Sequence, residues 1–132
     1  MNLLLDASLP PRLARALHQL ASPEYRVEHV RDVLGNDASD QHITDYLVQH
    51  EGTAMVGIDL DIISTPRRLD GLRACGRPVL LLHEDWLTLI AWDQSWQLAA
   101  LFPSIIRKLA KTEGPAIFLV PRLNAGRIRK VS

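Results

Sequence analysis

The chain has 132 residues, which is enough for one domain with a substantial buried core. Hydrophobic residues make up 47% and charged residues 23%, a balance that excludes a disordered chain, and no apolar run approaches the roughly 20 residues of a membrane span. The net charge is zero, but the charges are distributed unevenly along the chain. Residues 1–61 contain ten acids and four arginines, whereas residues 62–132 contain eleven bases and five acids.

Strand and helix patterns alternate along the chain. Leu3–Leu5 predicts a short buried strand that ends at Asp6, and Pro10-Pro11 then opens a helix with apolar residues at helical spacing. The further expected elements are a strand at 27–30, a helix opened by Asp37-Ala38-Ser39, a strand at 54–58, a helix around 64–75 that begins at Ser64 or Thr65, a strand at 79–82, a long helix through 98–109 that contains Pro103, and a strand at 116–120.

The expected strands are continuous apolar runs, which is typical of parallel strands that are covered on both faces. The sequence therefore predicts a single α/β domain over residues 1–132, an α/β/α sandwich with a mostly parallel five-stranded sheet. One cysteine, Cys75, cannot form an internal disulfide, and the N-terminus lacks the basic region and cleavage site of a signal peptide. We expect a cytoplasmic protein that has no contact with a membrane.

Acidic residues follow the predicted strands at their carboxyl ends, which meet at one edge of a parallel sheet. Carboxylates gathered there repel one another unless a cation shares them, and hard divalent cations such as Mg²⁺ or Mn²⁺ prefer oxygen ligands. We expect a metal site at this edge. The acids that the topology brings there are Asp6, Asp32, Asp40, Asp59 and Asp61.

Several of these acids also have a purely structural interpretation. Asp40 lies three residues after Asp37, so it could be the N3 residue of a helix that Asp37 caps. Asp32 could be a turn residue, and Asp61 could simply be exposed. Asp6 and Asp59 are harder to explain in this way, because a carboxylate at the end of a buried strand rarely lacks a partner.

The N-terminal half resembles the PIN-like nuclease superfamily, whose first strand ends in Asp-x-Ser or Asp-x-Asn. The resemblance covers residues 1–63, and beyond them only the strand pattern continues. The matching segments are Leu3-Leu4-Leu5-Asp6-Ala7-Ser8-Leu9-Pro10-Pro11-Arg12, His29-Val30-Arg31-Asp32, Ala38-Ser39-Asp40 and Gly57-Ile58-Asp59-Leu60-Asp61-Ile62. Members of the small PIN-like group that these segments resemble are similar to VapC-type toxins and are often encoded beside a small antitoxin.

The resemblance implies a Mg²⁺- or Mn²⁺-dependent endoribonuclease that cleaves single-stranded or loop RNA, as the toxin of a type II toxin–antitoxin pair. It implies that Asp6, Asp40 and Asp59 hold the metal and that Asp61 is a fourth catalytic acid. We expect Ser8, Arg12 and Arg31 to contact the substrate, since these residues lie near the acidic edge. The implied partners are RNA, a small antitoxin and a second copy of the chain.

Two departures from the family pattern leave other functions open. Gly57-Ile58 stands where the family has Thr-Lys, which removes a hydroxyl and a cation, and Ile62 replaces Phe. An inactive PIN-like binding module is therefore one alternative. A receiver-like phospho-acceptor domain is another, but it needs adjacent acids after the first strand and a lysine after the last, where this chain has Ala7 and Arg122.

Three tryptophans, Trp86, Trp92 and Trp96, cluster before the long helix. They either cover the core or anchor a partner or dimer interface, and the sequence leaves both interpretations open.

Overall fold

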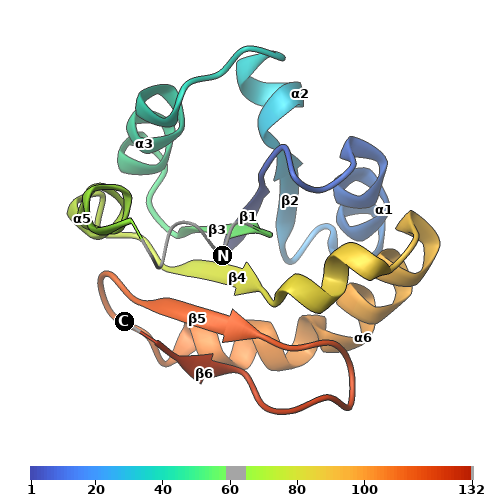
Figure 1. Cartoon of the computed structure of the whole chain (residues 1–132). Helices are drawn as coiled ribbons and strands as arrows, with labels where there is room; N and C mark the ends of the chain where they lie inside the picture. The colour runs from blue at the N-terminus through green and yellow to red at the C-terminus, as the bar shows by residue number, and fades with distance from the viewer. Residues whose placement is uncertain (59–64, 132) are drawn as a thin grey trace.

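The computed structural model describes residues 1–58 and 65–131, in which strands and helices alternate (Figure 1). The elements in chain order are β1 (Asn2–Leu5), α1 (Pro11–Ala21), β2 (Arg26–His29), α2 (Val30–Leu34), α3 (Asp40–Gln49), β3 (Thr53–Gly57), α5 (Pro66–Ala74), β4 (Val79–Leu82), the 3₁₀ helix η1 (Glu84–Thr88), α6 (Ala91–Ala110), β5 (Ile117–Val120) and β6 (Arg129–Lys130).

The strands form one sheet in the order β2-β1-β3-β4-β5-β6, in which every neighbouring pair is parallel except β5 and β6. The predicted α/β fold with a mostly parallel sheet is confirmed. The expected number of five strands is wrong, because the described residues contain a sixth. Strand β6 consists of two exposed basic residues and pairs with β5 through the backbone, so its sequence has no apolar pattern that would predict a strand.

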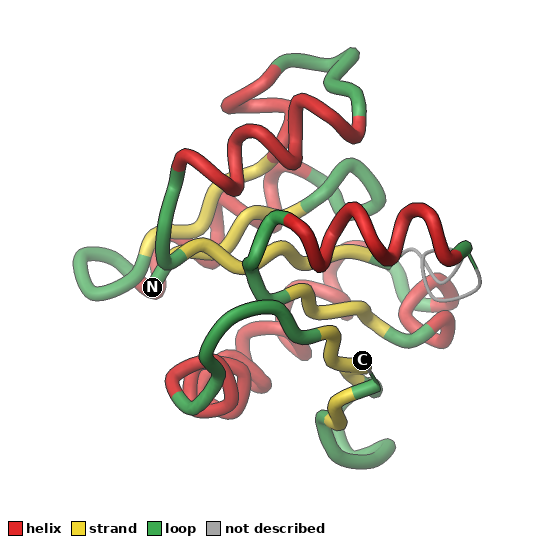
Figure 2. Tube along the Cα trace, turned by 90° about the vertical axis from the view of Figure 1, so that its left-hand side faces the viewer, coloured by secondary structure: helices red, strands yellow, loops and turns green. Residues whose placement is uncertain are grey.

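Helices cover both faces of the sheet, which gives the three-layer sandwich that the sequence predicts (Figures 1 and 2). Successive residues of a strand point to opposite faces. Leu3 and Leu5 of β1 therefore join the core beneath α1 and α6, whereas Leu4 joins the core beneath α3 and α5. The need to bury both faces explains why β1 and β4 consist almost wholly of leucine and valine.

The second strand ends one residue earlier than predicted, and Val30 begins the short helix α2 instead. The reason is the buried His29, which caps this helix. Its Nδ1 accepts a hydrogen bond from the backbone N–H of Arg31 at 3.0 Å, so the ring proton lies on Nε2, which donates to the carbonyl of Leu9 at 2.6 Å. His29 thus ties the start of α2 to the loop after β1.

The three tryptophans occupy different environments. Trp86 is completely buried, and its indole N–H donates to the carbonyl of Val120 at 3.1 Å. Trp92 and Trp96 lie on the first turns of α6 and are 76% and 48% exposed. The interpretation as core residues is therefore confirmed for Trp86 and wrong for Trp92 and Trp96.

Tyr46 of α3 connects this helix to the edge strand β2, because its hydroxyl donates to the Glu28 carboxylate at 3.3 Å. Burial raises the pKa of Tyr46 above the usual 10.0, and so do the charge of Glu28 and this hydrogen bond, while Arg26 lowers it. A raised pKa in the folded state means that stability is retained below about pH 10 and is lost as the pH rises through the folded value.

We therefore expect wild type to lose more free energy of unfolding than Tyr46→Phe between about pH 9 and pH 11. Urea titrations across this range provide the measurement. Equal losses in the two proteins would contradict the prediction.

Candidate functional site

The carboxyl ends of the parallel strands form the edge where the sequence predicts a metal site. Asp6 directly follows β1, Ile58 follows β3, and Asp40 begins α3. Asp59 and Asp61, which were predicted as catalytic acids, lie outside the described residues. The geometry of the candidate site is therefore given by Asp6, Asp40 and their neighbours.

Asp6 is held between the loop that it begins and the adjacent strand β3. Its backbone N–H donates to the carbonyl of Val56 at 2.9 Å, and its carboxylate Oδ1 accepts a hydrogen bond from the backbone N–H of Ser8. The hydroxyl oxygen of Ser8 in turn accepts from the N–H of Ile58 at 2.9 Å. Ser8, predicted to contact substrate, thus fastens the Asp6 loop to the end of β3.

The absence of a side chain at Gly57 leaves space for the Asp6 carboxylate. A Cβ atom at position 57 would lie 2.9 Å from Cγ of Asp6 and closer still to Oδ2, so no side chain fits there while Asp6 keeps its place. The departure from the family's Thr at this position therefore has a physical consequence. The Asp6 carboxylate fills the space that a threonine side chain would occupy.

Asp40 is the first residue of α3, and it does not cap the helix. The cap is Ser39, whose hydroxyl accepts from the N–H of His42 at 3.2 Å while the His42 ring accepts from the N–H of Ser39. The proposed N3 position for Asp40 is therefore wrong, because the residue that caps the helix is Ser39 and not Asp37. The Asp40 side chain is 81% exposed, and its Oδ2 lies 3.7 Å from Nε of Arg68.

The other charged residues of this region have separate positions. Asp32 lies in α2 and not in a loop, and its carboxylate pairs with Arg15 of α1 at 2.8 Å. Arg31, in the same short helix, and Arg12, in the first turn of α1, are both exposed. Their role in substrate binding stays a prediction.

The oxygen ligands of Asp6 and Asp40 are of the type that Mg²⁺ and Mn²⁺ prefer. Within residues 1–58 and 65–131, no three acidic, histidine or cysteine side chains form a group that could hold a metal ion. A set of three carboxylate ligands at this edge would therefore include Asp59, Asp61 or both.

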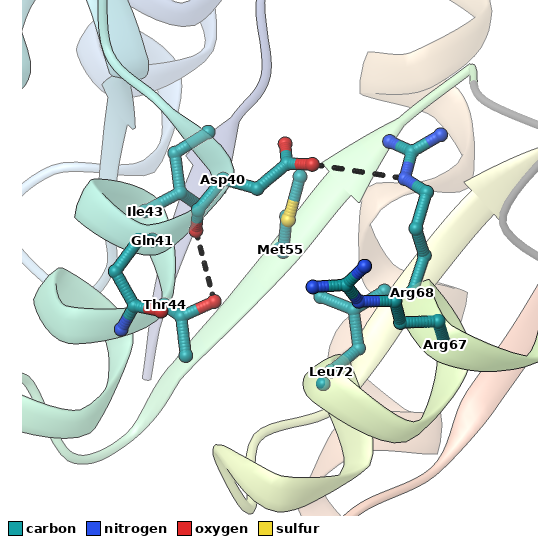
Figure 3. A pocket seen from close by; sticks show the side chains of 9 residues that line it. Asp40, Gln41, Ile43, Thr44, Met55, Arg67, Arg68 and Leu72 are labelled. Atoms are coloured by element: carbon teal, nitrogen blue, oxygen red, sulfur yellow. Dashed lines mark hydrogen bonds and ion pairs between the residues drawn. The ribbon is translucent and has the colours of Figure 1, made fainter.

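A pocket of about 410 Å³ lies between α3 and α5, next to Asp40 (Figure 3). Arg67 extends from α5 across the gap toward α3, and Met55 of β3 lies at the bottom between the two helices. The sequence predicts a helix around 64–75, but no motif distinguishes its arginines. The only signal for them is that Arg67 and Arg68 belong to residues 62–132, where bases outnumber acids. The lining residues are Asp40, Gln41, Ile43, Thr44, Met55, Arg67, Arg68, Gly71 and Leu72.

In the described part of the chain, none of the helices combines the length and the apolar character needed to cross a membrane.

No curated protein and no solved structure matches the sequence. The sequence model of the family described as "PIN like domain" matches residues 1–84, which include β1 to β4 and the start of η1. This match covers more than half of the chain and agrees with the mostly parallel sheet. The chain therefore belongs to the PIN-like domain family, whose fold is of the nuclease type.

Proposed function

We propose that this protein is a metal-dependent endoribonuclease that works at the edge formed by the ends of β1 and β3. The observation that supports this proposal most directly is the placement of Asp6. Its carboxylate is fixed by the Ser8 amide, and a strand position without a side chain, Gly57, leaves room for it. A carboxylate oriented by its neighbours in this way is suited to a defined role at a site.

In this proposal Asp6, Asp40 and Asp59 hold Mg²⁺ or Mn²⁺, and Asp61 is a fourth catalytic acid. When bound, such an ion neutralises charge on a phosphodiester and makes a water molecule more acidic. Asp6 and Asp40 would orient the ion by their carboxylate oxygens, and Arg12, Arg31 and Ser8 would contact the substrate. The exposure of both arginines leaves them available to phosphate groups.

The proposed substrate is single-stranded or loop RNA, because a flexible backbone can reach a shallow acidic edge that a stiff duplex cannot follow. The proposal extends to a cytoplasmic toxin of a type II toxin–antitoxin pair, with a small antitoxin as partner. A homodimer would give the exposed Trp92 and Trp96 a partner surface.

An inactive PIN-like module that binds RNA without cleaving it is the second candidate. The observation that favours it is that both described acids already have partners in the protein. Asp6 accepts from the Ser8 amide, and Asp40 lies beside Arg68. These contacts reduce the repulsion between the acids without a metal ion.

The test is a cleavage assay in which purified protein is incubated with a mixture of structured and unstructured RNAs. We expect cleavage of the unstructured RNAs in Mn²⁺ or Mg²⁺, no cleavage in EDTA, and weaker cleavage as salt rises, since phosphate contacts release counterions. The ions should also raise the melting temperature, because a ligand that binds only the folded state stabilises it. RNA binding without cleavage at every metal concentration would favour the inactive module instead.

A further inference from the structure

The pocket between α3 and α5 combines an apolar floor with charged groups at its rim. Met55 is buried in β3, and Ile43 and Leu72 are partly buried in the same core beneath the two helices. Asp40 and the two arginines belong to the amino-terminal ends of α3 and α5, on either side of this floor (Figure 3). A ligand that fits must therefore present an apolar body to the floor and a charged or polar group to the rim.

The other polar side chains of the lining already have partners within α3. Thr44 donates its hydroxyl proton to the carbonyl of Asp40 at 2.9 Å, and the Gln41 amide donates to Asp45 at 2.8 Å. Within the described part of the chain, Arg67 makes no side-chain hydrogen bond or ion pair. Its guanidinium is exposed and directed across the gap, so it is the donor available to a ligand.

The exposed guanidinium of Arg67 favours an anionic ligand. A guanidinium matches phosphate oxygens with two parallel hydrogen bonds, and the Asp40 carboxylate of the lining lies beside Arg68. The volume of about 410 Å³ lies within the range of pockets that bind small ligands, about 300–1,000 Å³. A planar aromatic base over Met55 would use the apolar floor, because thioether sulfur packs favourably against aromatic rings.

We propose that this pocket is a nucleotide subsite that binds one unit of the RNA strand, with the phosphate on Arg67 and the base against Met55, Ile43 and Leu72. The identification of RNA rests on the proposed function, whereas the binding of a nucleotide follows from the pocket itself. The subsite lies beside Asp40, so a nucleotide held there would place the neighbouring phosphodiester toward the acidic edge. Arg67 is then a residue that positions the strand.

The two methionines of the chain make a direct test possible, because a ¹³C-methyl methionine spectrum contains only the signals of Met1 and Met55. Protein in EDTA, which prevents metal-dependent cleavage, is titrated with a single-stranded RNA hexamer, with adenosine 5′-monophosphate and with inorganic phosphate. Because a base would stack near Met55, the RNA hexamer and adenosine 5′-monophosphate should each shift the methyl signal of Met55 until binding saturates. Inorganic phosphate lacks a ring and should leave the signal almost unchanged, and Met1 should not respond.

Arg67→Gln should weaken RNA binding about tenfold, which is the effect expected for one charge-assisted contact. Arg73→Gln is the matched control, because Arg73 is an exposed residue of the same helix outside the pocket, and it should weaken binding about twofold at most. An unmoved Met55 signal at saturating RNA, or equal weakening by the two substitutions, would overturn the subsite. A Met55 response in a protein that never cleaves RNA in Mn²⁺ would support the subsite and overturn only the nuclease proposal.

Discussion

Asp6→Asn is expected to abolish metal-dependent RNA cleavage while it leaves the fold intact. Asparagine has nearly the same shape as aspartate, and its carbonyl oxygen can still accept the hydrogen bond from the Ser8 amide. It lacks the negative charge that attracts a divalent cation. Loss of a residue that only supports a metal ligand typically costs about 10–100-fold, so we expect loss of a ligand itself to cost more than about a hundredfold.

The measurement is the initial rate of RNA cleavage in Mn²⁺, together with the metal-induced rise in melting temperature. Both should fall in Asp6→Asn, while the melting temperature in EDTA should stay close to that of wild type. Asp70→Asn provides the control, since this exposed residue of α5 undergoes the same chemical change away from the site. Equal cleavage by wild type and Asp6→Asn would remove Asp6 from the catalytic acids.

Gly57→Ala is expected to lower cleavage about a hundredfold, although alanine is the smallest possible side chain. The new Cβ would lie 2.9 Å from Cγ of Asp6, so the carboxylate would have to leave its present position. A displacement of about 1 Å at a catalytic group can cost about a hundredfold in rate. The loss of stability should stay near 1 kcal/mol, because the atoms that must move belong to the end of a single side chain.

A double-mutant cycle separates a role of Gly57 through Asp6 from a general disturbance of the strand. If Gly57 acts only by giving Asp6 its position, Gly57→Ala should cause no further loss of cleavage in the Asp6→Asn background. Metal affinity, measured by calorimetry, should fall in Gly57→Ala as well. Unchanged metal affinity and unchanged cleavage would show that the position of Asp6 has no part in the reaction.

The sequence by itself determined the class of fold and the position of Asp6 at the end of the first strand. A strand buried on both faces needs apolar residues, and β4, β5 and β1 from Leu3 onward consist of such runs. The start of α1 was also predictable, because Pro11 can occupy the first turn of a helix but not its interior. Asp6 follows from the same reasoning, since it ends the first of these runs.

The tertiary structure alone decided the features that depend on distant neighbours. Strand β6 exists because β5 offers an unpaired backbone edge, and its two basic residues carry no signal of their own. Trp86 is buried while Trp92 and Trp96 are exposed, although the residue type is the same.

The local arrangement of the site also depends on contacts between residues that are far apart in sequence. Gly57 ends β3 and Asp6 directly follows β1, and only the pairing of these two strands shows that Gly57 leaves space for the Asp6 carboxylate. The capping of α3 by Ser39 leaves Asp40 free of that role, and Arg68 of another helix becomes its neighbour. Periodicity and turn residues describe interactions within a few residues of the chain, whereas a site is formed by side chains that only the packing of helices and strands brings together.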